Sequence, residues 1–157
     1  MKFITLLILN FFDYFHKKKI VNFLKYKKII SLNALFDVGA HRGESVKFFT
    51  KFIMIKKIYC FEPSPDNFRI LKKNVNRYLN KKHTKVTFEN IALGKQNSEK
   101  KLIQYNETSS SSLKEINYLS KYYKKKNFFL NTSNNKILNI NQRKLKDYII
   151  EKKIYNF

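Results

Sequence analysis

The sequence predicts an α/β fold in which a doubly wound, mostly parallel sheet follows an N-terminal helical segment. Between residues 33 and 91, short apolar runs alternate with segments whose apolar residues recur at helical spacing. Strands that alternate with helices pair in parallel, because each helix carries the chain back across the sheet. At 157 residues the chain suits one domain with a sizeable core. We expect a helical segment over 1–32 and the sheet domain over 33–157.

The N-terminal segment mixes apolar residues with lysines. The stretch "MKFITLLILNFF" is interrupted by Asn10 and followed by Asp13, so it falls short of the roughly 18 apolar residues of a membrane span. It also lacks the small-residue cleavage site of a secretory signal. Two interpretations remain: a helix packed on the domain, which we favour, or a basic amphipathic helix on an anionic membrane. We expect a cytoplasmic protein, with peripheral contact at the inner membrane face under the second interpretation.

The alternating region contains three expected strands, with a helix after each of the first two. The second helix has the clearest signals: Ser64 suits the N-cap, Pro65 the first helical position and Asp66 the first turn. Its apolar face comprises Phe68, Leu71, Val75 and Leu79. The expected strands are 33–38, 57–62 and 85–91, and the expected first helix is 44–53.

The pattern loosens after Gly94. "KKLIQYNE" and "KILNINQ" predict strands, and "LKDYIIEKK" predicts a short helix. The segment between the two strands, rich in serine and lysine, predicts a loop with one helical turn. "IYNF" suggests a strand that is just starting.

The composition constrains the function. The net charge is +22, but only four of the 33 basic residues are arginines, and the lysines are spread over the whole chain. This pattern is more typical of a solvated surface than of a specific nucleic-acid site. The single cysteine, Cys60, excludes an internal disulfide and suits a buried strand position. The histidines at 16, 41 and 83 lack metal-ligand spacing, so we expect no metal site.

The stretch "FDVGAHRGE" holds two of the chain's three glycines, Gly39 and Gly43, directly after the first expected strand. In a doubly wound sheet, ligands bind at the carboxyl ends of the strands. Gly39 allows a sharp turn and a close approach of a ligand, and Gly43 lets the next helix begin against the sheet. Two acids flank this crevice: Asp37 precedes the turn, and Glu62 ends the second strand before Pro63. A carboxylate at Glu62 can accept two hydrogen bonds from a ribose diol.

The two acids favour one class of cofactor. A nicotinamide dinucleotide site usually has the pattern G-x-G-x-x-G, whereas this loop has G-x-x-x-G. Asp37 would also repel a pyrophosphate. S-adenosylmethionine contains an ammonium group, a carboxylate, a ribose diol and an adenine, and no phosphate. Asp37 can hold the ammonium group and Glu62 the ribose, so we expect S-adenosylmethionine as the cofactor.

The motifs "FDVGAHRGE", "YCFEPSPDNFRILKKN" and "ENIALG", in this order, resemble the FkbM family of S-adenosylmethionine-dependent methyltransferases. The resemblance runs from about Leu35 to the chain end. It implies a Rossmann-like fold and O-methylation of a sugar or another small hydroxyl acceptor. The implied ribose ligand is Glu62, with Pro63 near the nucleoside and Asn90 and Ile91 near the adenine. The full implied cofactor set is Asp37, Gly39, Ala40, His41, Gly43, Glu62, Pro63, Asn90 and Ile91.

The resemblance has one departure. "TSSSSL" at 108–113 and "LNINQRKLKDYIIEKKI" also match the family, which then continues with a strand carrying an acidic I-D-x-E-G-type motif. This chain ends at Phe157, where that strand would begin. We therefore expect an incomplete sheet that lacks its fourth strand and part of the substrate pocket, and no measurable methyl transfer by the chain as given. No residue is compelling as the general base, since His41 lies in the cofactor loop and the helix dipole explains Glu44.

Three functional classes stay open on the sequence alone. The first is a methyltransferase acting on a saccharide or other small-molecule hydroxyl. The second is a basic nucleic-acid- or membrane-surface-binding module derived from a Rossmann-like half, and the third is a nicotinamide enzyme. Binding of S-adenosylmethionine separates the first class from the others, and a steep salt dependence of affinity for RNA or anionic vesicles would favour the second.

Overall fold

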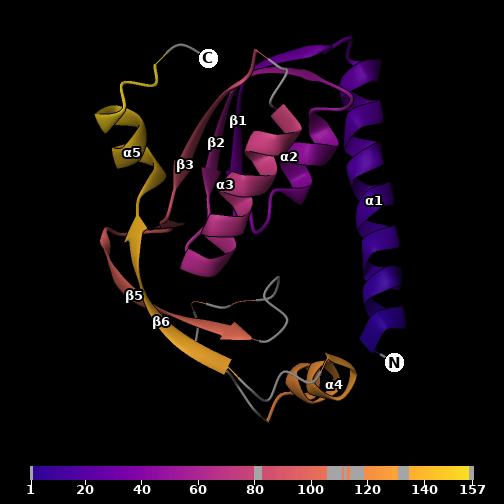
Figure 1. The fold of residues 1–157 in the computed structure, drawn as a ribbon, viewed down its shortest axis with the longest axis vertical. Coiled ribbons are helices and arrows are strands. Elements are labelled where there is room, and N and C mark those ends of the chain that lie inside the picture. The colour runs from indigo at the N-terminus through magenta and orange to yellow at the C-terminus, as the bar shows by residue number, and fades with distance from the viewer. Residues whose placement is uncertain are drawn as a thin grey trace.

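A computed structural model describes residues 2–79, 83–105, 111, 113, 119–130 and 135–155 (Figure 1). The helices are α1 (Lys2–Tyr26), α2 (Glu44–Phe49), α3 (Pro65–Leu79), α4 (Lys121–Leu130) and α5 (Leu145–Glu151). The strands are β1 (Ser31–Val38), β2 (Met54–Phe61), β3 (Lys85–Glu89), β4 (Ala92–Leu93), β5 (Ser98–Tyr105) and β6 (Asn135–Arg143).

The first three strands form a parallel sheet in the order β1-β2-β3. Val38 lies opposite Phe61, and Phe61 lies opposite Glu89, so the three strands end together at one edge. Both pairings are parallel because a helix returns the chain between strands, α2 after β1 and α3 after β2. The predicted α/β class is therefore confirmed.

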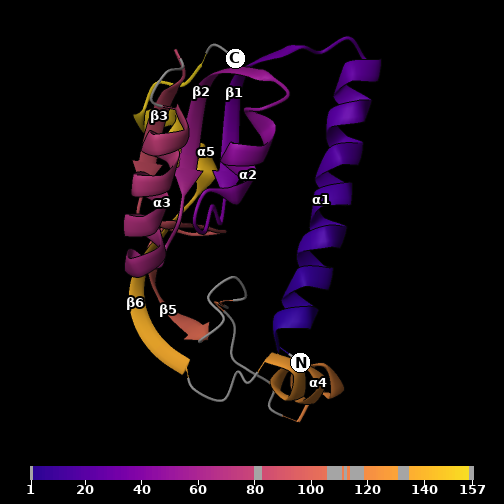
Figure 2. The same ribbon diagram turned by 45° about the vertical axis from the view of Figure 1, so that its right-hand side comes forward.

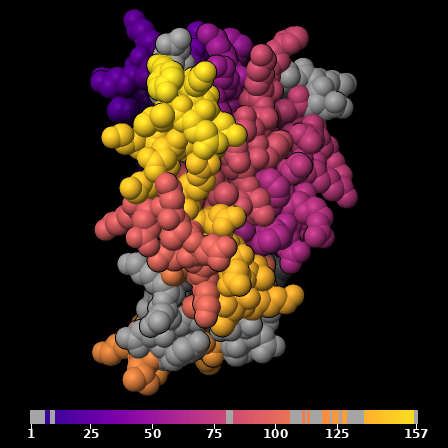
Figure 3. Space-filling model, turned by 90° about the vertical axis from the view of Figure 1, so that its left-hand side faces the viewer, coloured from indigo at the N-terminus to yellow at the C-terminus, as the bar shows by residue number. Residues whose placement is uncertain are grey.

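Helices cover both faces of this sheet, as a doubly wound fold requires. On one face, α2, α3 and part of α1 bury a core that includes Val21, Val46, Ile58, Cys60, Leu71 and Val75. On the other face, Tyr148 of α5 packs edge-on against Phe61, with ring centroids 5.0 Å apart. Figure 3 shows that face, where α5 (yellow) lies above the strands β5 and β6 (salmon and orange). The placement of Cys60 as a buried strand residue is also confirmed.

Helix α3 begins and packs as its sequence predicts. The Ser64 hydroxyl accepts a bond from the Asn67 amide at 3.4 Å, which is an N-cap contact. The same hydroxyl donates to the side chain of Gln104 on β5 at 2.7 Å, and both residues are buried. The predicted apolar face points inward, with Leu71, Val75 and Leu79 buried and Phe68 packed beside them.

A second, smaller sheet has the order β4-β6-β5, and the sequence did not predict it as a separate unit. Strand β6 pairs in parallel with β4 and antiparallel with β5. The strand predicted over 85–91 ends at Glu89, because the chain then leaves the first sheet and enters β4. Gly94 follows β4, and a Cβ there would lie 2.3 Å from the Gln142 side chain, so glycine permits this close approach.

Several predicted bounds were wrong. Helix α2 ends at Phe49 rather than at 53, and the Thr50 hydroxyl donates to the Val46 carbonyl at 2.8 Å where the helix stops. Strand β2 spans Met54–Phe61 rather than 57–62, and the prediction began too late because the exposed Lys56 interrupts the apolar pattern. The expected single helical turn before β6 is the ten-residue α4, and 154–155 form no strand. The residues 156–157 lie outside the described part.

Helix α1 packs through its C-terminal half, as the favoured interpretation predicted. Val21 is fully buried, the Tyr14 and Phe48 rings meet edge-on at 5.6 Å, and the Lys18 ammonium lies 4.4 Å from the centre of the Phe52 ring. Figure 2 shows that the N-terminal half of α1 runs away from α2 towards α4. None of the described helices combines the length and apolar character needed to cross a bilayer.

Replacing Gly43 by alanine is expected to destabilise the protein by about 2–4 kcal/mol. Its φ of +87° strains any L side chain, and a Cβ would lie only 2.7 Å from Val75 Cγ2 on α3. The matched control is Gly39→Ala, which has a similar φ of +74° but no atom within 4 Å of the new Cβ. That variant should lose only about 1–2 kcal/mol in urea unfolding. Equal losses in the two variants would show that the contact with α3 is unimportant.

Candidate functional site

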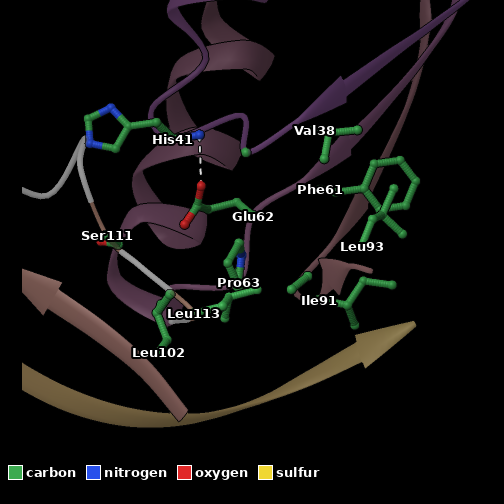
Figure 4. A pocket seen from close by; sticks show the side chains of 12 residues that line it. Val38, His41, Phe61, Glu62, Pro63, Ile91, Leu93, Leu102, Ser111 and Leu113 are labelled. Atoms are coloured by element: carbon green, nitrogen blue, oxygen red, sulfur yellow. Dashed lines mark hydrogen bonds between the residues drawn. The ribbon is translucent and has the colours of Figure 1, made fainter. Parts of the chain in front are cut away.

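A hollow of about 230 Å³ lies at the carboxyl edge of the parallel sheet (Figure 4). It is formed where β1 and β2 end, with further walls from the segment after β3 and from β5. The edge is the place at which doubly wound folds bind ligands. The lining residues are Val38, Gly39, His41, Phe61, Glu62, Pro63, Ile91, Ala92, Leu93, Leu102, Ser111 and Leu113.

The glycine turn is held by the end of β2. The amides of Gly39 and Ala40 both donate to the Phe61 carbonyl, at 2.9 and 3.0 Å. Gly39 lies in the left-handed region, and a Cβ there would meet nothing within 4 Å. Because Gly39 also lines the hollow, that open space is available to a ligand.

Glu62 joins the turn to the start of α3. One carboxylate oxygen accepts from the His41 amide at 2.8 Å, and the other accepts from the Ser64 amide at 2.9 Å. The residue is only 5% exposed, and burial raises the pKa of its carboxyl despite these stabilising bonds. The two amides fix the carboxylate in one orientation at the wall of the hollow, as Figure 4 shows for the bond to His41.

Asp37 lies one residue before the end of β1, behind the turn. Its Oδ2 atom is buried and has no hydrogen-bond partner among the described residues. Burial raises the pKa of this carboxyl to about 6, although the charge of Lys17 opposes the shift. The charges of Glu44 and Glu62 raise it further, so three acids share this corner of the fold. A buried acceptor without a donor is costly unless a ligand supplies the donor.

Glu44 closes the loop from the side of α2. It accepts from the Arg42 amide at 3.1 Å and lies 3.3 Å from the Nδ1 atom of His41, whose backbone has a positive φ of 48°. Burial raises the pKa of Glu44, but these bonds outweigh it and leave the pKa below its ordinary value. His41 and Glu44 therefore act together in shaping the loop.

Gly43 is the N-cap of α2 and has a φ of +87°, so the helix begins where the sequence predicted. The space beside its Cα is filled by Val75 and Leu71 of α3. Its missing side chain therefore also lets the loop pack against α3.

Asn90 ties two strand ends together. Its amide nitrogen donates to the carbonyls of Glu62 at 2.7 Å and Pro63 at 3.1 Å. The side-chain donor of Asn90 is therefore used to hold the end of β2 beside the segment after β3. Pro63 and Ile91 line the hollow directly. Asn90 therefore joins the two strand ends that border the hollow and is not itself part of the lining.

The structure divides the predicted residues into two groups. Those that line the hollow are Gly39, His41, Glu62, Pro63 and Ile91, and those outside its lining are Asp37, Ala40, Gly43 and Asn90. Of the serine-rich segment 108–113, Ser111 and Leu113 are described, and both line the hollow.

Sequence reasoning missed the apolar wall. Val38 and Phe61 could have been found, because they end the two strands that carry the acids. Leu102 lies on β5, and no local pattern indicates that the second sheet approaches this edge. Within the described ranges, no group of three or more His, Cys, Asp or Glu side chains could hold a metal ion.

Comparisons with known proteins gave one structural likeness. No protein-family model and no curated protein sequence matches the chain. A structure described as "Methyltransferase FkbM from Methylobacillus flagellatus KT" matches with a TM-score of 0.43 and 16% sequence identity. The matched region covers 74% of the present chain but only 22% of the chain in that structure. The fold class stated above follows from the strand order and pairing themselves.

Asp37→Asn is expected to stabilise the unliganded protein by about 1–3 kcal/mol at pH 7.5. The folded-state pKa of about 6 exceeds the ordinary value of 3.8, so the folded protein holds this proton more tightly than the unfolded chain. The cost of the buried charge is complete above pH 6 and disappears as the pH falls towards 3.8. Urea unfolding at pH 7.5 and pH 4 should therefore show a gain that vanishes at the lower pH.

The control for this experiment is Glu99→Gln, which alters an exposed acid on β5. It should change the unfolding free energy by no more than about 0.5 kcal/mol at either pH. A loss of stability in Asp37→Asn at pH 7.5 would contradict the unpaired state of this carboxylate.

Proposed function

We propose that this chain binds S-adenosylmethionine in the hollow at the sheet edge and serves methyl transfer to the hydroxyl of a sugar or another small molecule. The observation that carries the proposal is the buried, unpartnered Oδ2 of Asp37 beside the glycine turn. The motif resemblance over 35–157 supports the same reaction class.

The charge at the site favours a cationic ligand group. Asp37, Glu44 and Glu62 interact with one another, and Lys17 is the cation that acts most strongly on Asp37. Asp37 lies behind the turn and does not line the hollow, so an ammonium group at the turn would reach it directly or through a water molecule. Such a contact would supply the missing donor and lower the cost of the buried charge. The pyrophosphate of a nicotinamide dinucleotide would instead add negative charge to this corner. This contrast supports S-adenosylmethionine over a dinucleotide.

Glu62 can bind a ribose hydroxyl. Each carboxylate oxygen accepts one backbone amide, and the Asn67 side chain also bonds to this carboxylate. Of the roughly four acceptor positions of a carboxylate, one then remains for a hydroxyl of the ribose. The apolar side chains of Ile91 and Leu93, together with Pro63, offer a surface for a flat base on the same side.

When bound, the cofactor would supply a methyl group on a positively charged sulfur, which is already a good leaving group. The contribution of the chain is then largely to hold the reacting groups in line. The titratable side chains in the described lining are His41 and Glu62, and both take part in the hydrogen bonds that shape the loop. We therefore assign them positioning roles and assign no general base among the described residues.

Asp37→Asn should weaken S-adenosylmethionine binding by roughly 5- to 150-fold in isothermal titration calorimetry at pH 7.5. The physical reason is the loss of a charge-assisted hydrogen bond to the ammonium group. Glu99→Gln is the matched control and should bind as the wild type does. Wild-type affinity in Asp37→Asn would exclude this assignment, and tighter binding of a nicotinamide dinucleotide would favour a different enzyme class.

The affinity of the wild type should also fall by about tenfold per pH unit below pH 6, because protonated Asp37 cannot pair with a cation. The pKa of about 6 sets the position of the decline. In Asp37→Asn this decline should be absent. A wild-type affinity that stays constant between pH 7.5 and pH 5 would show that Asp37 does not contact the charged group.

A further inference from the structure

The N-terminal half of α1 presents an apolar surface that the domain does not cover. Five large side chains there are 47–65% exposed: Leu7, Ile8, Phe11, Phe12 and Phe15. Phe11 packs mainly on its own helix, with its ring centroid 4.6 Å from that of Phe15 and 5.9 Å from that of Phe12. The buried contacts of α1 begin further along, around Val21. Contiguous exposed apolar surface of this kind marks an interaction site.

Lysines flank this apolar surface at both ends. The C-terminal part of α1 and the following turn carry Lys17, Lys18, Lys19, Lys25, Lys27 and Lys28. The one acid of α1, Asp13, is paired with Lys17 at 2.7 Å. Helix α4 contacts α1 and lies beside its N-terminal end (Figures 1 and 2). It has no acidic residue and presents three exposed lysines, at 121, 124 and 125, with Phe128 70% exposed.

The positive charge and the apolar character of this surface together indicate what binds to it. A second copy of the chain would bring the same lysines against each other, and each chain has a net charge of +22. An RNA strand would pair with the lysines and could stack on the exposed rings of Phe11 and Phe12, but it would leave the aliphatic Leu7 and Ile8 without an apolar partner. An anionic bilayer surface accepts both features, because the apolar side chains enter the acyl boundary while the lysines meet the headgroups.

We propose that α1 and α4 together bind the surface of an anionic lipid bilayer, with the apolar half of α1 inserted at the interface. The lysine stems of both helices can extend along the apolar side chains and leave their ammonium groups at headgroup level. The hollow at the sheet edge is lined by none of these residues, although the charge of Lys17 acts on Asp37. The variants below leave Lys17 unchanged, so they test the membrane surface separately from the proposed enzymatic function.

The direct test measures co-sedimentation of the full chain with vesicles. The chain should bind vesicles of phosphatidylcholine and phosphatidylglycerol, and should not bind phosphatidylcholine alone. The double variant Phe11→Ser, Phe12→Ser removes two side chains that are 59% and 65% exposed. It should lose at least about tenfold in vesicle affinity while its thermal melt stays unchanged. Ile137→Ser, which alters a 63% exposed residue on β6, is the matched apolar control and should bind normally.

The charge contribution is tested separately. Replacing Lys121, Lys124 and Lys125 by glutamine should weaken binding by roughly fivefold per lysine, and added salt should have less effect on this variant. The matched control replaces three exposed lysines elsewhere, at 73, 101 and 146, and carries the same net charge. An equal loss in both triple variants would reduce the effect to net charge and overturn the proposed surface.

Three further results would overturn the proposal. The first is equal binding to neutral and anionic vesicles, or binding to neither. The second is a dimer in sedimentation analysis that dissociates in the Phe11→Ser, Phe12→Ser variant without any vesicle binding, which would identify a second copy as the occupant. The third is salt-sensitive binding to poly-U that exceeds vesicle binding and survives the double serine variant, which would identify RNA.

Discussion

The carboxylate of Glu62 determines the geometry of the sheet edge. It accepts the amide of His41 from the loop after β1 and the amide of Ser64 from the start of α3. Glu62 directly follows β2, the middle strand of the sheet. Its own amide donates to the carbonyl of Glu89, at the end of β3, at 3.0 Å. All three parallel strands are thus linked through one residue. The loop at His41 and the N-terminus of α3 are fixed to this carboxylate, while the glycine turn is held by the neighbouring Phe61 carbonyl.

The parts of the fold with short-range causes could be predicted from the sequence. Helix α3 is the clearest example, because Ser64, Pro65 and the spacing of Leu71, Val75 and Leu79 each specify the same element. The parallel order of β1, β2 and β3 followed from the alternation of elements. The second sheet could not be predicted, because β5 and β6 are separated by about thirty residues and nothing local indicates their pairing. Helix α4 was missed because its lysines and aromatic residues lack helical periodicity, and its contact is with α1.

The site shows the same division between local and long-range causes. Asp37, Gly39 and Glu62 could be identified because the carboxyl ends of parallel strands converge on one edge. The role of each residue depends on its contacts in the folded protein, which cannot be read from the sequence. The amide of Asn90, expected near an adenine, also joins the ends of two strands. Gly43, expected at the start of a helix, caps α2 and also makes room for α3. The resemblance that suggested methyl transfer rests on sequence motifs. Motifs indicate which residues lie near the sheet edge, but they do not indicate which atoms each residue contacts.

The hydroxyl of Ser64 connects two parts of the molecule that the chain order keeps apart. It caps α3 and also donates to Gln104 in the second sheet, in a region closed to water. If β5 separated from the first sheet, Gln104 would leave that buried hydroxyl without its acceptor, at an appreciable cost in free energy. The bond therefore couples the opening of β5 to that of the α3 N-terminus, and we expect amides in these two segments to exchange with solvent together.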